Sequence, residues 1–306
     1  MHHVDPQARA AGLRLVLSST LFATMALLAK VASRHVPGTQ AAAVRFATGV
    51  IATVVLWGAG RVDIRPRRWR WLIARGVFGG SAVLAYFSSM QRISVGEATL
   101  LNYTQPIFTM LGAWVLLRER PPRRALAALP LTVVGIALIV GIRLSDLHAS
   151  VGQLLGLLSA VLSGVAVTSI RAARREVAEG PPAETTWSVF FSFTALGLLV
   201  SLPTVLPPFG RWVQPTAREW AILLGVGVTS VLAQLILSEA LRHVRVGTAG
   251  IISQLTAVFA IGGGALLLGE PLSPGFLGGA ALTLSGVALV VLGVGAPPKF
   301  LERLRR

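Results

Sequence analysis

The chain carries one segment twice, as VGEATLLNYTQPIFTMLGAWVLLRE at residues 95–119 and as VGTAGIISQLTAVFAIGGGALLLGE at residues 246–270. The match extends without a gap over residues 86–141 at a shift of 151 positions, and it pairs Glu119 with Glu270. Each copy is long and apolar enough to cross a bilayer, which takes about 20 residues. The sequence therefore contains an internal repeat of membrane-spanning segments.

The composition is typical of a protein embedded in a lipid bilayer. Of its 306 residues, 54% are hydrophobic and 13% are charged, whereas a soluble domain carries about 25% charged residues. The net charge of +16 comes from short basic runs between apolar stretches, which is the pattern of cytoplasmic loops, so no nucleic-acid partner is expected. The chain has no cysteine, which excludes disulfides, thiolate nucleophiles and Cys-ligated metal centres.

We predict an all-α membrane protein with ten transmembrane helices, because the apolar stretches are twice the length of barrel strands. Residues 1–143 would form a first five-helix repeat, residues 151–296 a second, and residues 297–306 a basic cytoplasmic tail. Because five is odd, the second repeat would be inverted relative to the first. The expected spans are 13–33, 39–59, 71–90, 96–117, 125–142, 151–170, 185–206, 219–241, 246–268 and 272–295.

The distribution of basic residues predicts the orientation. With the N-terminus inside, the cytoplasmic segments hold 20 Lys and Arg residues and the outer loops hold five, which satisfies the positive-inside rule. All seven Trp residues lie near predicted span ends, where an aromatic belt forms. We therefore expect a multi-pass protein of a bacterial inner membrane with both termini in the cytoplasm.

Polar side chains mark a candidate substrate site in the fourth span. Thr99, Asn102 and Gln105 recur every three residues on one helix face, Tyr103 lies beside them, and Pro106 removes a backbone hydrogen bond near mid-bilayer and is a candidate kink or gate. The second copy offers polar residues at matching positions, namely Ser253, Gln254 and Thr256. Facing stripes of this kind would form a central cavity. The alternative is that these groups only hydrogen-bond neighbouring helices.

A second polar group lies on the third and eighth spans. Gln234 and Ser238 share a face with Ser230 on the eighth span, and Tyr86 lies on the third. A ring with a hydroxyl suits an organic substrate with an apolar body, but a buried Tyr bonded to a neighbouring helix fits equally well.

Charged residues inside the spans are weighed separately, because they are costly in hydrocarbon. Arg45 could receive a carboxylate or phosphate, whereas Lys30 lies near a span end, where extension towards the membrane surface is the more frequent arrangement. Glu239 is a candidate for proton coupling, although Arg242 and His243 offer it a helical salt bridge. Helix-end and capping roles are expected for Glu97, Glu119 and Glu270.

The sequence also resembles a known family. LLNYTQPIFT at residues 100–109, followed by Glu119, is similar to the fourth-helix pattern of the EamA family in the drug/metabolite transporter superfamily, and LLGEP at residues 267–271 is similar to its second copy. Arg45 and Phe46 resemble that family's second-helix arginine, whereas LFAT at residues 21–24 replaces a common Trp-Gly pair. The resemblance implies a ten-helix transporter similar to the bacterial exporters of amino acids and other metabolites.

These observations predict a secondary active transporter that moves a small organic metabolite by alternating access. The substrate is expected to be amino-acid-like and exported, and the alternative is an importer of a nucleotide-like or cofactor-like anion. Transport would be proton-coupled or facilitative, since the sequence has no ATP-binding P-loop. No nucleophile–base pair, metal ligand set or cofactor site is recognisable, so an enzyme is not expected. A channel would need a ring of charge, which is not visible.

Overall fold

The computed structural model describes residues 6–118, 130–135, 138–139, 150–174, 181–240 and 253–294. Regular structure in these ranges is helical, without strands. The helices are α1 (Pro6–Ala32), α2 (Gly38–Gly58), α3 (Trp69–Met90), α4 (Val95–Asn102), α5 (Gln105–Leu117), α7 (Val151–Arg174), α8 (Thr186–Val205), α9 (Ala217–Ala240), α11 (Leu255–Leu268) and α12 (Pro274–Val294).

Seven segments of the described chain are long and apolar enough to cross a membrane. They are Gly12–Ala32, Gly38–Gly58, Trp69–Met90, Val95–Leu117, Val151–Arg174, Thr186–Val205 and Ala217–Leu237. The prediction of an all-helical, multi-pass membrane protein is thereby confirmed. Most of the expected fifth span and the start of the ninth lie outside the described residues, so the full count of ten stays a prediction.

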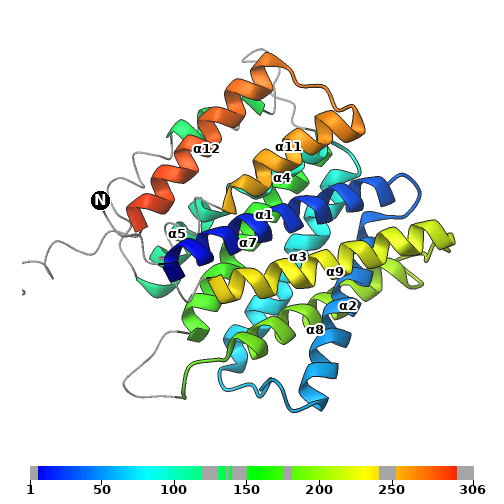
Figure 1. Ribbon diagram of the computed structural model, residues 1–306, viewed down its shortest axis with the longest axis vertical. Helices are drawn as coiled ribbons and strands as arrows, with labels where there is room; N and C mark the ends of the chain where they lie inside the picture. The colour runs from blue at the N-terminus through cyan, green and yellow to red at the C-terminus, as the bar shows by residue number, and fades with distance from the viewer. Residues whose placement is uncertain are drawn as a thin grey trace, which may run out of the picture.

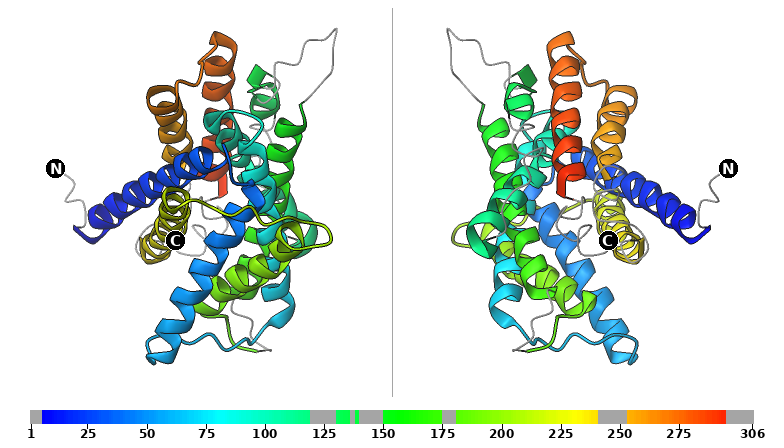
Figure 2. Two further views of the ribbon diagram at one scale, coloured as in Figure 1. Left: turned by 90° about the vertical axis from the view of Figure 1, so that its right-hand side faces the viewer. Right: turned by 90° about the vertical axis from the view of Figure 1, so that its left-hand side faces the viewer.

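The helices pack as a bundle in which segments distant in sequence are neighbours. Helix α1 lies between α9 and α11 (Figure 1), and α3 packs against both α7 and α8. Helix α2 packs against α8 and α9. Seen from the side, α11 and α12 lie at one end of the molecule, and α2 and α8 lie at the other (Figure 2). Both halves of the chain therefore contribute to the interior.

Small residues allow close contact between α3 and α8. A Cβ atom added at Gly80 would lie 2.6 Å from the Cα atom of Gly197, so the two backbones touch directly. The ring of Phe46, which is fully buried, fills the adjacent space beside Gly197. Such contact between small residues is a principal source of helix association in membranes, where no hydrophobic force drives it.

The fourth expected span is interrupted at the point where its polar residues gather. Helix α4 ends at Asn102, a turn follows, and α5 begins at Gln105. Pro106 lies in the first turn of α5, where its missing N–H group has no partner to lose. The expected single helix over 96–117 is thus two helices. The first helix ends before Pro106, so the segment has a turn there instead of a kink at the proline. Helix α11 likewise begins directly after a turn at Gln254, 151 positions after Tyr103.

The Gly80 contact predicts a sharp stability effect. We expect Gly80→Ala to lower the melting temperature by several degrees and reduce the monodisperse fraction in detergent, because overpacking against backbone costs about 1–3 kcal/mol. Gly58→Ala is the matched control, since no atom lies within 4 Å of its added Cβ. Fluorescence-detected gel filtration and thermal unfolding measure both variants, and equal stability of the two would contradict the packing described here.

Candidate functional site

The interruption between α4 and α5 is held by side chains of three other helices. On α3, the Tyr86 hydroxyl shares a 2.6 Å hydrogen bond with the Thr99 hydroxyl of α4, and both side chains are buried. At the end of α4, Asn102 Nδ2 donates to Ser159 Oγ of α7 at 2.9 Å. Both contacts are hydrogen bonds between neighbouring helices. For these residues, such bonds were the alternative to substrate binding in the sequence analysis. They place α4 firmly against α3 and α7.

The turn itself faces the start of α11. The Tyr103 hydroxyl lies next to the Thr256 hydroxyl, but Thr256 Oγ1 is buried and makes no hydrogen bond of ordinary geometry. Gln254 is buried and turned towards α12, where its amide, in the orientation that satisfies both ends, pairs with Leu284 O and Ala288 N. The turn after α4 and the start of α11 therefore meet at Tyr103 and Thr256, while Gln254 binds α12.

Three of the predicted site residues keep side chains without a hydrogen-bond partner in the described part of the chain. These are Gln105, Ser253 and Gln234, and all three are partly exposed. Gln105 begins α5 and Ser253 lies just before α11, whereas Gln234 lies within α9. The side chains of Ser238 and Glu239, as well as the whole of Glu119, Arg242 and His243, lie outside the described residues. Their proposed roles stay predictions.

Arg45 is buried inside the bundle. Its side chain is on α2 with only 6% of the residue exposed, and Nε donates to Ser230 Oγ of α9 at 2.6 Å. The sequence placed Ser230 on the same face as Gln234, so this polar face of α9 is directed towards α2. Arg45 therefore lies in the interior and does not extend to the membrane surface.

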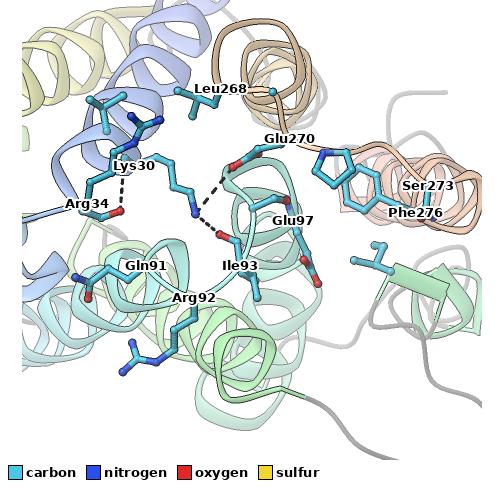
Figure 3. A pocket seen from close by; sticks show the side chains of 16 residues that line it. Lys30, Arg34, Gln91, Arg92, Ile93, Glu97, Leu268, Glu270, Ser273 and Phe276 are labelled. Carbon is cyan, nitrogen blue, oxygen red and sulfur yellow. Dashed lines mark hydrogen bonds and ion pairs between the residues drawn. The ribbon is translucent and has the colours of Figure 1, made fainter.

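A pocket of about 670 Å³ lies at the end of the bundle where α1 ends and α4 begins. Its walls come from the end of α1, the loop between α3 and α4, and the loop between α11 and α12 (Figure 3). Three of the charged residues in its walls are Lys30, Glu97 and Glu270. This pocket is separate from the polar groups at the interrupted helix, none of which lines it.

Lys30 points into this pocket, contrary to the expectation that it reaches the membrane surface. Its ammonium group donates to the carbonyl oxygens of Met90 and Ile93, at 2.6 Å each, and lies 4.0 Å from Glu270 Oε1. The carbonyls at the end of α3 and in the following loop lack helical partners, so they attract the cation. The expectation was wrong because the end of α1 lies against this loop, whose carbonyl oxygens accept hydrogen bonds from the ammonium group.

Glu270 also caps a helix from the other half of the chain. Its two carboxylate oxygens accept hydrogen bonds from the backbone N–H group of Val95, at 2.8 and 3.0 Å. The expected capping role is confirmed, but the capped helix is α4, 175 positions away. Glu97 accepts a 2.7 Å hydrogen bond from Gln153 of α7. The sequence predicted helix-end roles for Glu97 and Glu270. It did not predict their partners, which are distant in the sequence.

Comparisons with known proteins agree with this architecture. The model of the EamA-like transporter family matches twice, over residues 10–141 and 150–292. The chain is 31% identical to the pseudopaline exporter CntI of Pseudomonas aeruginosa over 90% of this chain and 92% of that protein. It is 30% identical to an uncharacterized transporter of Helicobacter pylori over 77% of this chain and 76% of that one.

A solved crystal structure shares the fold, with a TM-score of 0.64, 22% identity, and coverage of 97% of this chain and 99% of the other. The family match spans nearly all of the chain, and the helical bundle with its membrane-length apolar helices is what a membrane transporter requires. The chain belongs to the EamA-like transporter family.

Proposed function

We propose that this protein is a secondary active transporter that exports a small, amino-acid-like metabolite across a bacterial inner membrane by alternating access. The observation that carries the proposal is the break between α4 and α5, together with a turn directly before α11 at the matching position of the second half, and the unpaired polar side chains of Gln105 and Ser253 beside them. Interrupted helices are the usual place where transporters bind substrates near mid-membrane. The exporter CntI, similar over 90% of this chain, supports the outward direction.

The proposed architecture is ten helices in two inverted repeats, residues 1–143 and 151–296. The family model matches each half separately, and the turns at Tyr103 and Gln254 are 151 positions apart. These two facts support the repeat independently of helix counting. Rocking of one repeat against the other would expose Gln105, Ser253 and Gln234 to each side in turn.

The contacts of Glu270 with Lys30 and with the start of α4 would act as a gate at the end that the basic residues assign to the outside. Lys30 and α4 belong to the first repeat, and Glu270 belongs to the second. Movement of the second repeat away from α4 would break a charge-assisted hydrogen bond, which is worth about 1.5–3 kcal/mol. Closing of the outer end would therefore be stabilised by this contact.

Import of a nucleotide-like or cofactor-like anion is the alternative, and buried Arg45 is the observation that favours it. A singly charged carboxylate on an amino-acid-like substrate satisfies the same arginine. Coupling to protons would require a carboxylate that changes its protonation, for which Glu239 is the candidate.

Substitutions at Asn102 and Ser159 can distinguish substrate binding from helix contact. Each substitution removes the same hydrogen bond between α4 and α7, but only Asn102 is a proposed substrate-binding residue. We expect Asn102→Ala to lower export about ten-fold, and Ser159→Ala to leave it within about two-fold, since 1.4 kcal/mol of lost binding is ten-fold. Both variants should lose similar thermal stability, corresponding to about 1 kcal/mol. Amino acids released into the medium by expressing cells are quantified by mass spectrometry. Equal export by the two variants would leave Asn102 a helix contact only.

The proposed gate can be tested with a reporter cysteine, because the native chain has none. We expect Glu270→Ala to accelerate labelling of Ala98→Cys, a fully buried position on α4, by about ten- to hundred-fold with a membrane-impermeant maleimide, because it removes about 1.5–3 kcal/mol from the closed state. Glu219→Ala is the matched control, since Glu219 accepts from Thr216 in its own first turn. Unchanged labelling in Glu270→Ala would remove this contact from the mechanism.

The orientation has a direct test. A tag placed after Arg306 should react with an impermeant reagent only after the cells are permeabilised, because the excess of basic residues keeps that side in the cytoplasm. Labelling of intact cells would reverse the assignment, and it would turn the Lys30 pocket towards the cytoplasm.

A further inference from the structure

Arg45 is buried inside the bundle and Arg75 is partly buried beside it, and among the described residues neither has a carboxylate partner. Arg45 is on α2 and Arg75 is on α3, and both fall within membrane-length segments. In the part of the chain that the structure describes, neither guanidinium forms an ion pair, and Arg45 makes one hydrogen bond, to Ser230. Charged groups inside a membrane protein are costly and are ordinarily paired or functional.

Both guanidinium groups lie on one aromatic ring. The Cζ atom of Arg75 is 3.9 Å from the ring centroid of Phe193 on α8, and the Cζ atom of Arg45 is 5.4 Å from the same centroid. The two cations are close enough to repel each other. The ring of Phe46 packs edge-on against Phe193 at 5.3 Å. An aromatic face partly compensates a desolvated cation, but it does not accept the hydrogen bonds of two guanidinium groups.

Each arginine has a buried nitrogen without a partner. These atoms are Arg45 Nη1 and Arg75 Nε. Gly79 leaves the space in which Arg75 lies, since a Cβ atom there would collide with Arg75 Nη1. Buried donors are almost always satisfied in native proteins, and here both unsatisfied donors belong to mutually repelling cations. An anion is the kind of group that would satisfy both donors and both charges.

We infer that Arg45 and Arg75 form a subsite that binds the carboxylate group of the transported metabolite. Two buried donors without partners match the two oxygens of one carboxylate, whereas a phosphate would bring further oxygens into an aromatic site that offers them nothing. This inference rests on the proposed function and adds to it, because it assigns a group of the substrate to named residues. Arg75 was not among the site residues predicted from the sequence.

Glu239 is on the same helix as Ser230, the hydrogen-bond partner of Arg45. It lies nine residues after Ser230 on α9, which is about 13 Å along a helix, and α9 packs against α1 and α2. Its contribution can be tested directly, since Glu239→Gln should leave carboxylate binding by the arginines unchanged.

Thermal unfolding of the purified protein in detergent tests the subsite without knowledge of the substrate. The probes are sodium acetate, sodium phosphate and sodium chloride at equal ionic strength. We expect acetate to raise the melting temperature of the unaltered protein by a few degrees more than chloride or phosphate. The increment should disappear in Arg45→Gln and Arg75→Gln. Arg92→Gln is the control, because Arg92 is exposed and donates only to Ser88 O at the end of α3.

Arg75→Met separates a binding role from a structural one by the sign of its effect. Replacing a buried charge that has no partner by an apolar residue stabilises a protein. We therefore expect Arg75→Met to melt above the unaltered protein in chloride and to lose that advantage in acetate. A structural arginine would give the opposite, a lower melting temperature in every salt. That result, or a stronger effect of phosphate than of acetate, would overturn the inference.

Export by cells distinguishes failure of the subsite from failure of the proposed function. Arg45→Gln and Arg75→Gln should each reduce amino-acid export at least ten-fold, and Arg75→Lys should restore only part of it. Unchanged export in both Gln variants would overturn the subsite while the exporter stands. Conversely, an arginine-dependent acetate effect without any amino-acid export would support the subsite and reject the proposed substrate.

Discussion

The requirement that every backbone polar group be paired inside the membrane governs this structure. It permits the chain to break between α4 and α5 only because local groups take over the pairing. Thr104 supplies a hydroxyl that donates to Leu101 O at 2.7 Å, and the N–H of Tyr103 still reaches Thr99 O. At the other end of α4, Ser94 and Glu270 satisfy the first N–H groups. A half-length helix with both ends satisfied can sit deep in the bundle.

The interior contains charges in two different conditions. Lys30 is surrounded by carbonyl oxygens and lies near a carboxylate, so its charge is compensated by the protein itself. Arg45 and Arg75 have two aromatic rings, Phe193 and Phe46, and one hydroxyl around them, and the two cations repel each other. The first arrangement stabilises one packing of the two halves. The unpaired charges of Arg45 and Arg75 raise the free energy of the ligand-free protein. Binding of an anionic ligand would lower it, and this would increase the affinity for a dilute substrate.

Composition and apolar length were sufficient to predict a multi-pass helical membrane protein, and the LLNYTQPIFT segment was sufficient to indicate its family. The interruption of the fourth span was predicted only in part. Pro106 indicated a kink in the helix, but no residue indicated that the helix ends at Asn102. The direction of Lys30 depends on carbonyls of the α3–α4 loop, about 60 residues away, so no local pattern shows it. Arg75 was missed for the same reason, since its partner ring, Phe193, is on α8.

Helix α3 joins these features physically. It carries Arg75 near one end and Tyr86 eleven residues later, about 16 Å along the axis, where the Tyr86 hydroxyl binds Thr99 of α4. Helix α4 in turn is capped by Glu270, which lies beside Lys30. A carboxylate that draws Arg45 and Arg75 together would therefore act on α3, whose contact with α4 leads to the proposed gate. Substrate binding and gating can therefore be coupled, because α3 carries Arg75 and also contacts α4 through Tyr86.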